Sequence, residues 1–198
     1  MTTVTVLGVD PGLTRCGVGV VRGGRARVEL VASSVVRTPT ALPIEQRLAL
    51  LYAALVEVIA AQQPDVVACE RVLFSANART AMGVGQAAGV ALLAAAEAGV
   101  PVTSYSPNEV KLTVAGDGAA DKAAVARMVA VQLRLADPPR PADVADALAV
   151  ALCHLAKAPF LPTAAALSSA AATLAAATAQ AASAQRGGWE AVVARIRS

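Results

Sequence analysis

Residues 4–21, VTVLGVDPGLTRCGVGVV, decide the fold of this chain. Residues 3–9 are apolar and β-branched, which predicts a strand, and the DPG that follows is a turn signal. Two more strand-like runs, residues 16–21 and 26–36, are joined through a pair of glycines. The chain is therefore predicted to open with a β-meander.

Helical and strand patterns alternate after the meander. Apolar residues at helical spacing predict a helix over 43–62, a short strand follows at 66–69, and a second helix covers 78–98. A last strand at 100–105 precedes helices at about 107–114, 121–135 and 141–158. This order predicts the α/β class, with a five-stranded mixed sheet flanked by helices.

Length and composition divide the chain into two segments. Residues 1–158 are long enough to bury a core as one domain. Residues 159–198 form an alanine-rich, low-complexity C-terminal tail, for which a transient helix and disorder are both open, and which we expect to take no part in chemistry. A membrane span there is disfavoured, because Ala, Ser and Gln gain little from lipid.

Net charge, cysteine usage and the start of the chain bear on the partners and the location of the protein. The net charge of +3 is only a hint of a polyanionic partner. The cysteines Cys16, Cys69 and Cys153 are odd in number, widely spaced and set in apolar sequence, which favours reduced core residues over disulfides or a metal site. The chain also opens on a strand pattern without a secretory signal, so we expect a cytoplasmic location.

Acidic residues occur in three local settings that we expect to converge. Asp10 ends the first apolar run, Glu70 ends the run DVVACE, and Asp143 and Asp146 lie three apart in the helical segment PADVADALAVALCHL. The carboxyl ends of neighbouring strands are the usual position for a site in an open α/β sheet. Four carboxylates in one volume repel one another, and divalent cations relieve the repulsion. Oxygen ligands without a thiol or imidazole cluster favour Mg²⁺ or Mn²⁺ over Zn²⁺.

Each of these residues also has a simpler reading. Asp10 suits an ordinary turn, an isolated Glu70 is more often exposed, and the two helix aspartates complement the helix dipole. DPGLTRCG has the form DxGxxxxG, which phosphate loops of actin-like ATPases and sugar kinases share, and Gly12 there lets a phosphate or metal approach the backbone. His154, the single histidine, is best read as a structural residue.

Two further features remain open between a structural and a functional reading. Basic side chains in the segments that flank the acids are either solvated charges or phosphate contacts: Arg71, Arg79, Lys111, Lys122 and Arg127. The helix over 78–98 carries Gly83, Gly85 and Gly89 among many alanines. These small residues either allow tight packing on the sheet or form a homodimer seam.

Four segments in order resemble the RuvC family of Holliday-junction resolvases: VLGVDPG, ERVLFSANARTAMGVGQAAGVAL, SPNEVKLTVAGDGAADKAAV and DVADALAVALCH. The resemblance covers roughly residues 4–158. It implies an RNase H-like fold, a homodimer and symmetrical nicking of four-way DNA junctions in recombination and repair. It also implies work alongside the RuvA and RuvB branch-migration proteins.

The same resemblance assigns roles to individual positions. Asp10, Glu70, Asp143 and Asp146 match the catalytic, metal-binding acids of the family, and Lys111 and Lys122 match its basic positions near the scissile phosphate. The family commonly has an aromatic residue, associated with opening the junction centre, where this chain has Leu73, and Phe74 comes one place later. The implied chemistry is phosphodiester hydrolysis with two Mg²⁺ ions per site, for which Mn²⁺ is a substitute.

Two other classes compete with this reading. An actin-like ATPase or kinase would use DPGLTRCG for phosphate, but it needs two such domains, and the chain is short and shows no second phosphate loop. A non-catalytic protein that binds DNA structures is the other class, and the four intact acids argue against it.

Overall fold

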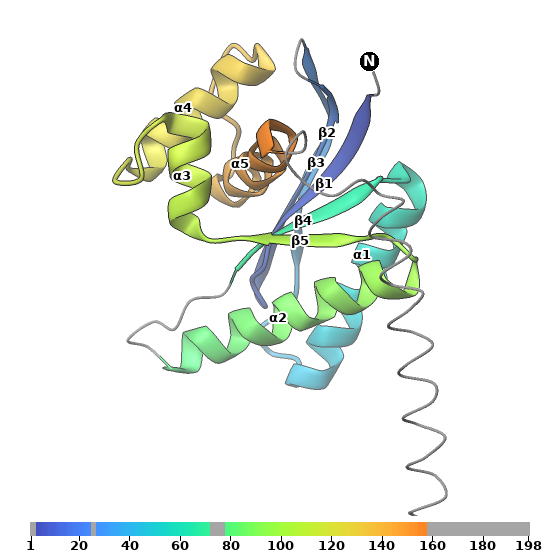
Figure 1. Ribbon diagram of the computed structural model, residues 1–198. Helices are drawn as coiled ribbons and strands as arrows, with labels where there is room; N and C mark the ends of the chain where they lie inside the picture. The colour runs from blue at the N-terminus through green and yellow to red at the C-terminus, as the bar shows by residue number, and fades with distance from the viewer. Residues whose placement is uncertain (1–2, 25–26, 72–77, 158–198) are drawn as a thin grey trace, which may run out of the picture. The chain divides into compact units, whose positions relative to one another are not determined.

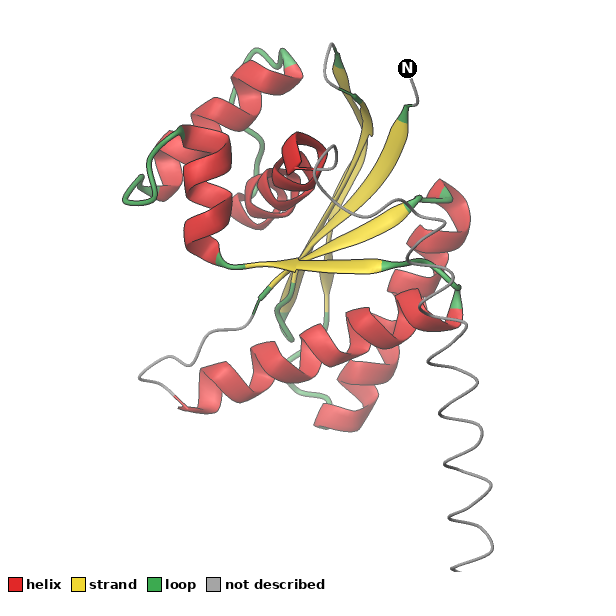
Figure 2. Ribbon diagram, viewed as in Figure 1, coloured by secondary structure: helices red, strands yellow, loops and turns green. Residues whose placement is uncertain are grey.

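The computed structural model describes residues 3–24, 27–71 and 78–157, and Leu73, Phe74 and the 159–198 tail lie outside them. Its strands and helices follow the predicted order (Figures 1 and 2). They are β1 (Val4–Asp10), β2 (Arg15–Gly23), β3 (Val28–Arg37), α1 (Ile44–Gln62), β4 (Val66–Glu70), α2 (Ala78–Glu97), β5 (Val102–Tyr105), α3 (Pro107–Ala115), α4 (Lys122–Leu133) and α5 (Ala142–Lys157). The α/β prediction is therefore confirmed, with element ends that differ by one or two residues.

The strands form one five-stranded mixed sheet in the order β3-β2-β1-β4-β5. β1, β2 and β3 pair antiparallel, as the predicted meander requires, whereas β4 runs parallel to both β1 and β5. The register between β1 and β4 pairs Val9 with Cys69. Asp10 and Glu70, the next residue of each strand, therefore end neighbouring parallel strands.

Helices cover both faces of this sheet. α1 and α2 lie on one face and α3, α4 and α5 on the other (Figure 1). Successive side chains of β1 point to opposite faces of the sheet. Val6 therefore packs with α5, whereas Leu7 and Val9 pack with α1 and α2. The core therefore consists of two apolar layers, one on each face of the sheet.

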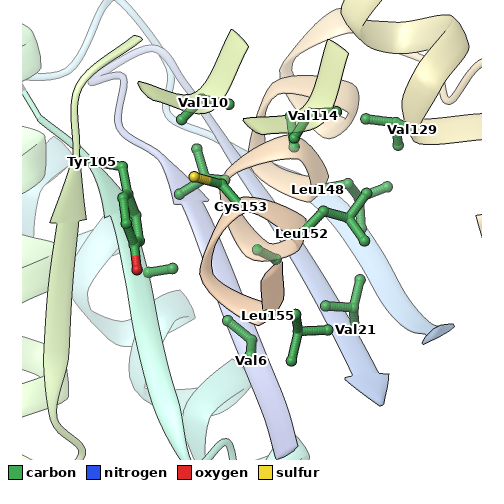
Figure 3. Packing of buried hydrophobic residues seen from close by; sticks show 14 of the residues in the cluster. Val6, Val21, Tyr105, Val110, Val114, Val129, Leu148, Leu152, Cys153 and Leu155 are labelled. Atoms are coloured by element: carbon green, nitrogen blue, oxygen red, sulfur yellow. The ribbon is translucent and has the colours of Figure 1, made fainter. Parts of the chain in front are cut away.

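α5 is the central helix of its layer and is buried along almost its whole length. Leu148 and Leu152 of this helix pack with β-strand residues on one side and with α3 and α4 on the other (Figure 3). Glycines on the sheet allow the helix to come very close. A Cβ on Gly8 would lie 2.0 Å from the carbonyl oxygen of Ala147, so a side chain at that position would push α5 off the sheet.

The structural readings of the cysteines and the histidine are confirmed. Cys16, Cys69 and Cys153 are buried free thiols. His154 is 6% exposed, and its Nδ1 lies 3.0 Å from the hydroxyl oxygen of Tyr105, which satisfies the ring inside the core. Burial lowers the pKa of His154, so the neutral form is favoured.

The glycines of α2 do not pack on the sheet. Alanines such as Ala87, Ala91 and Ala95 make that contact. Gly85 and Gly89 are exposed, and in the described ranges no atom lies within 4 Å of a Cβ built on either one. Tight sheet packing is therefore the wrong explanation for these two glycines, and the homodimer seam stays a prediction. None of the helices in the described part of the chain has the length and apolar character needed to cross a membrane.

Candidate active site

The strands direct two acids to the same side of the sheet. Asp10 lies two and four residues after Gly8 and Val6, which both face α5, so strand alternation places its carboxylate on that face. Glu70 follows by the same argument from Val66 and Ala68, which belong to the α5 layer of the core. Two carboxylates on adjacent strand ends therefore point toward the same helix.

The start of α5 brings the other two acids to this point. Asp10 pairs with Gly17 across β1 and β2, and a Cβ on Gly17 would lie only 2.0 Å from the carbonyl oxygen of Asp143. The missing side chain thus lets the helix begin directly beside the end of β1. Asp146 lies three residues on, on the same helical face as Asp143.

The ionised forms of the two strand acids, Asp10 and Glu70, are disfavoured by their surroundings. Burial, followed by the charges of Glu70, Asp146 and Asp143, raises the pKa of Asp10 to about 7, although Lys122 opposes the shift. Burial and then the charge of Asp146 also raise the pKa of Glu70. The site therefore favours protonation of its strand acids or the arrival of a cation.

The two helix acids already have cationic partners. The Arg15 guanidinium donates two hydrogen bonds to Oδ2 of Asp143, from Nε at 3.0 Å and from Nη2, and this contact lowers the pKa of the carboxyl group. Lys122 donates to Oδ2 of Asp146 at 2.6 Å, which raises the pKa of the lysine. Among the described residues, the helix acids form ion pairs whereas neither strand acid does.

The predicted lysines belong to the same site. Lys111 of α3 and Lys122 of α4 line a small cleft of about 80 Å³ together with Glu70 and Asp146. The four acids and the two lysines, separated by up to 136 positions in the sequence, are therefore brought together. Their catalytic and DNA-binding roles stay predictions.

Of the other predicted DNA-binding residues, only Arg71 has a described side chain. Arg71 follows β4 directly, but its Nη2 donates to the carbonyl oxygen of Ser104 at 3.3 Å. Arg79 lies in the first turn of α2, and its side chain is not described. Leu73 and Phe74 fall in the segment 72–77, outside the described residues.

Sequence reasoning missed Arg15 as a partner of the site. The signal was present, because Arg15 and Gly17 share one side of β2 while Cys16 belongs to the opposite core layer. Gly12, by contrast, was expected to open the backbone to a ligand. A Cβ there would lie 2.2 Å from the carbonyl oxygen of Arg15, so Gly12 accommodates the turn of the chain itself.

The donor set fits a hard divalent cation. Carboxylate oxygens are the ligands that Mg²⁺ and Mn²⁺ prefer, and the raised pKa of both strand acids shows that positive charge would be stabilising there. Within the described ranges, however, no three acidic, histidine or cysteine side chains lie in a geometry that holds an ion as they stand. As they stand, Oδ2 of Asp143 is bonded to Arg15 and Oδ2 of Asp146 to Lys122.

The strand order β3-β2-β1-β4-β5 with helices on both faces is an RNase H-like architecture, and the convergent acids are compatible with a nuclease. Comparison with known proteins makes the class specific. A family model described as "Crossover junction endodeoxyribonuclease RuvC" matches residues 6–154. The chain belongs to this family, so the predicted family, fold and enzyme class are confirmed.

Individual relatives agree with this membership. The chain is 54% identical over 166 residues to crossover junction endodeoxyribonuclease RuvC of Rhodococcus opacus, covering 83% of this chain and 88% of that protein. It is 55% identical over 151 residues to the enzyme of the same name from Salinispora arenicola, covering 76% and 86%. A solved structure of T. thermophilus RuvC in complex with Holliday junction substrate is 42% identical, with a TM-score of 0.76, covering 79% of this chain and 96% of that one.

Proposed function

We propose that this endodeoxyribonuclease resolves four-way (Holliday) DNA junctions by paired symmetrical nicks, with Asp10, Glu70, Asp143 and Asp146 as its metal-binding catalytic acids. The observation that carries the proposal is their convergence from β1, β4 and α5. Glu70 and Asp146 line a cleft with Lys111 and Lys122, and the charges of Glu70, Asp146 and Asp143 all act on Asp10. Similarity over most of the chain to a RuvC solved with a Holliday junction substrate supports the choice of DNA.

The four acids would hold two divalent cations, Mg²⁺ in the cell with Mn²⁺ as a substitute. Asp10 ends the strand between β2 and β4, so its carboxylate lies between Glu70 and the helix acids and is the natural one to be shared. Such ions, when bound, activate water as a nucleophile and stabilise the negative charge that develops on the departing oxygen.

The basic residues of the cleft would position the substrate. Lys122 is paired with Asp146 but its side chain is 78% exposed, so it can turn to a DNA phosphate when a cation occupies the acids. Lys111 reaches the same cleft from α3. We assign Arg71 and Arg79 to the flanking DNA backbone, and Leu73 or Phe74 to the junction centre. Charge-based contacts of this kind make binding fall steeply with salt.

The paired cuts require two sites related by symmetry, and α2 offers a surface for a homodimer. Met82, Leu92 and Leu93 are 65%, 42% and 51% exposed, and the exposed Gly85 and Gly89 lie between them. An apolar face with small residues allows two helices to approach closely. A two-fold dimer through this face would place one site on each of two like-polarity strands.

The remaining parts of the proposal concern the wider system. Residues 1–158 would form the nuclease domain, and the 159–198 tail would take no part in catalysis. The cytoplasm would be its location, and the RuvA and RuvB branch-migration proteins would be its partners.

A direct assay tests the proposed function. The purified full chain is incubated with end-labelled four-way junction and with linear duplex of the same arms, in Mg²⁺, in Mn²⁺ and in chelator. We expect metal-dependent nicks at symmetrical positions in the junction and no comparable cleavage of the duplex. Tight junction binding without cleavage in either metal would instead support a non-catalytic DNA-structure-binding protein. Light scattering of the same sample checks the dimer.

A further inference from the structure

Arg15 contacts the site from a position fixed by the sheet. It is the first residue of β2, and its side chain lies on the α5 side because Cys16 belongs to the opposite core layer. The guanidinium donates from both Nε and Nη2 to the same oxygen of Asp143, Oδ2, although the two residues are 128 positions apart in the sequence. A pair of bonds to an ionised group is a strong, directional contact.

The loop that precedes Arg15 is anchored on the other side. Thr38, only 4% exposed, donates its hydroxyl to the carbonyl oxygen of Leu13 and its backbone N–H to that of Thr14 at 3.2 Å. Arg47 of α1 then donates to the side chains of Thr38 at 3.0 Å and Thr14 at 2.7 Å. The backbone beside Arg15 is therefore held in place, which distinguishes its ion pair from a contact between two freely moving surface chains.

Arg15 and a bound metal ion would compete for the same carboxylate, that of Asp143. The guanidinium bonds through two nitrogens to Oδ2 of Asp143, so a cation that used this oxygen would compete with Arg15 for it. A guanidinium and a divalent cation also repel each other across a few ångströms. Arg15 is 40% exposed, so its side chain can withdraw into solvent when a stronger cation arrives.

We propose that Arg15 is a positioning residue that acts as an internal counterion of Asp143, and that a divalent cation displaces it when the site fills. The inference rests on the proposed metal site and adds a regulatory property to it. Arg15 holds the Asp143 carboxylate in place in the metal-free protein. It also raises the metal concentration at which the site becomes occupied. The Lys122–Asp146 pair is the corresponding contact one turn further along α5.

Metal binding measured without DNA tests this inference. Mn²⁺ is titrated into the metal-free full chain, and free Mn²⁺ is followed by electron paramagnetic resonance. For Arg15→Gln we expect binding about two- to fivefold tighter than in the wild type, the range expected for loss of a partly exposed ion pair. Arg15→Lys keeps the positive charge but makes a less directional contact. Its affinity for Mn²⁺ should therefore lie between those of the wild type and Arg15→Gln. The Mg²⁺ concentration for half-maximal cleavage should decrease in the same order.

Two controls separate the contact from general effects of charge and folding. Arg47→Gln removes one positive charge beside the same loop without a bond to Asp143, and its effect on Mn²⁺ affinity should be clearly smaller than that of Arg15→Gln. In an Asp143→Asn background, Arg15→Gln should no longer tighten binding. A structural role of Arg15 would not produce this coupling.

The outcomes distinguish the inference from the proposed function. Unchanged or weaker Mn²⁺ binding in a folded Arg15→Gln or Arg15→Lys protein overturns the counterion role, and so does equal tightening in the Asp143→Asn background. Failure of the wild type to bind Mn²⁺, or wild-type binding by Asp10→Asn, overturns the metal site itself. Circular dichroism establishes that each variant is folded.

Discussion

The strand acids and the helix acids of this site differ in how their charge is balanced. Asp10 and Glu70 come from buried strand ends, and their pKa values are raised mainly by burial. Asp143 and Asp146 come from the start of α5, and each is bonded to a cationic side chain. The strand acids therefore have the greater electrostatic need of a cation, whereas each helix acid already has a positive partner.

Removing a strand acid should have the largest effect. We expect Asp10→Asn to reduce the single-turnover rate of junction cleavage in Mg²⁺ by about a thousandfold or more, because the substitution removes the carboxylate that we propose to be shared by the metal ions. Junction affinity in a gel-shift assay should stay close to that of the wild type. Asp137→Asn, a change at an exposed acid, is the matched control and should leave both quantities unchanged. Wild-type-like nicking by Asp10→Asn would remove this residue from the catalytic set.

The same substitution should stabilise the metal-free protein at alkaline pH. The folded-state pKa of Asp10 is raised from 3.8 to about 7, so the stability linked to its proton is present below pH 3.8 and is lost as pH rises through about 7. Asparagine carries no such charge. In chelator at pH 8, we expect Asp10→Asn to increase the free energy of unfolding by on the order of 2–4 kcal/mol.

Urea unfolding of both proteins between pH 4 and pH 8 measures this difference. It should shrink toward pH 4, and it should also shrink when Mg²⁺ replaces the chelator, because a bound cation stabilises the ionised wild type. A constant difference across the pH range would contradict the raised pKa of Asp10.

The two lysines of the cleft should affect rate more than affinity. Lys122→Ala and Lys111→Ala each remove one charge from the cleft that holds Glu70 and Asp146. We expect cleavage to slow by about 10- to 100-fold, since charge close to the scissile phosphate is most effective in the transition state. Junction affinity should change by less than about threefold, because each lysine is one of many phosphate contacts. Unchanged single-turnover rates would place both lysines outside the chemistry.

The smallest effect is expected at the far end of α5. Tyr105→Phe removes the hydroxyl that is paired with His154 but keeps the buried ring. The free energy of unfolding should decrease by about 1 kcal/mol, the typical contribution of one hydrogen bond. Cleavage by the folded variant should stay at the wild-type rate. A large loss of cleavage would instead show that the Tyr105–His154 pair supports catalysis. The C-terminal part of α5 would then not be purely structural.

The strand part of the site was predictable because it depends on local pattern. An apolar run with a two-residue period fixes which face each side chain takes, so Asp10 and Glu70 could be placed at adjacent strand ends. Asp143 and Asp146 could be placed on one helical face for the same reason. The order of strands and helices followed from the same periodicities.

The contacts that depend on tertiary distance were not predictable in this way. Strand alternation places Arg15 on the α5 side of β2, but it does not identify Asp143, 128 positions away, as the partner of this residue. Its place in DPGLTRCG directed attention to a phosphate loop instead. α2 was ambiguous because Ala and Gly occur on every side of the helix, so the sequence does not show which small residues meet the sheet. Only the packed structure shows that Gly85 and Gly89 face outward.

The position of α5 at the end of the described chain also affects when the enzyme becomes active during its synthesis. The ribosome produces β1 and β4 first, and their acids stay incomplete as a ligand set until residues 142–157 have emerged and docked against Gly8 and Gly17. Contacts between such distant segments form late, because a long loop has to close before they can be made. A chain that ends before residue 142 lacks Asp143 and Asp146, so the proposed set of four acids would be incomplete in it.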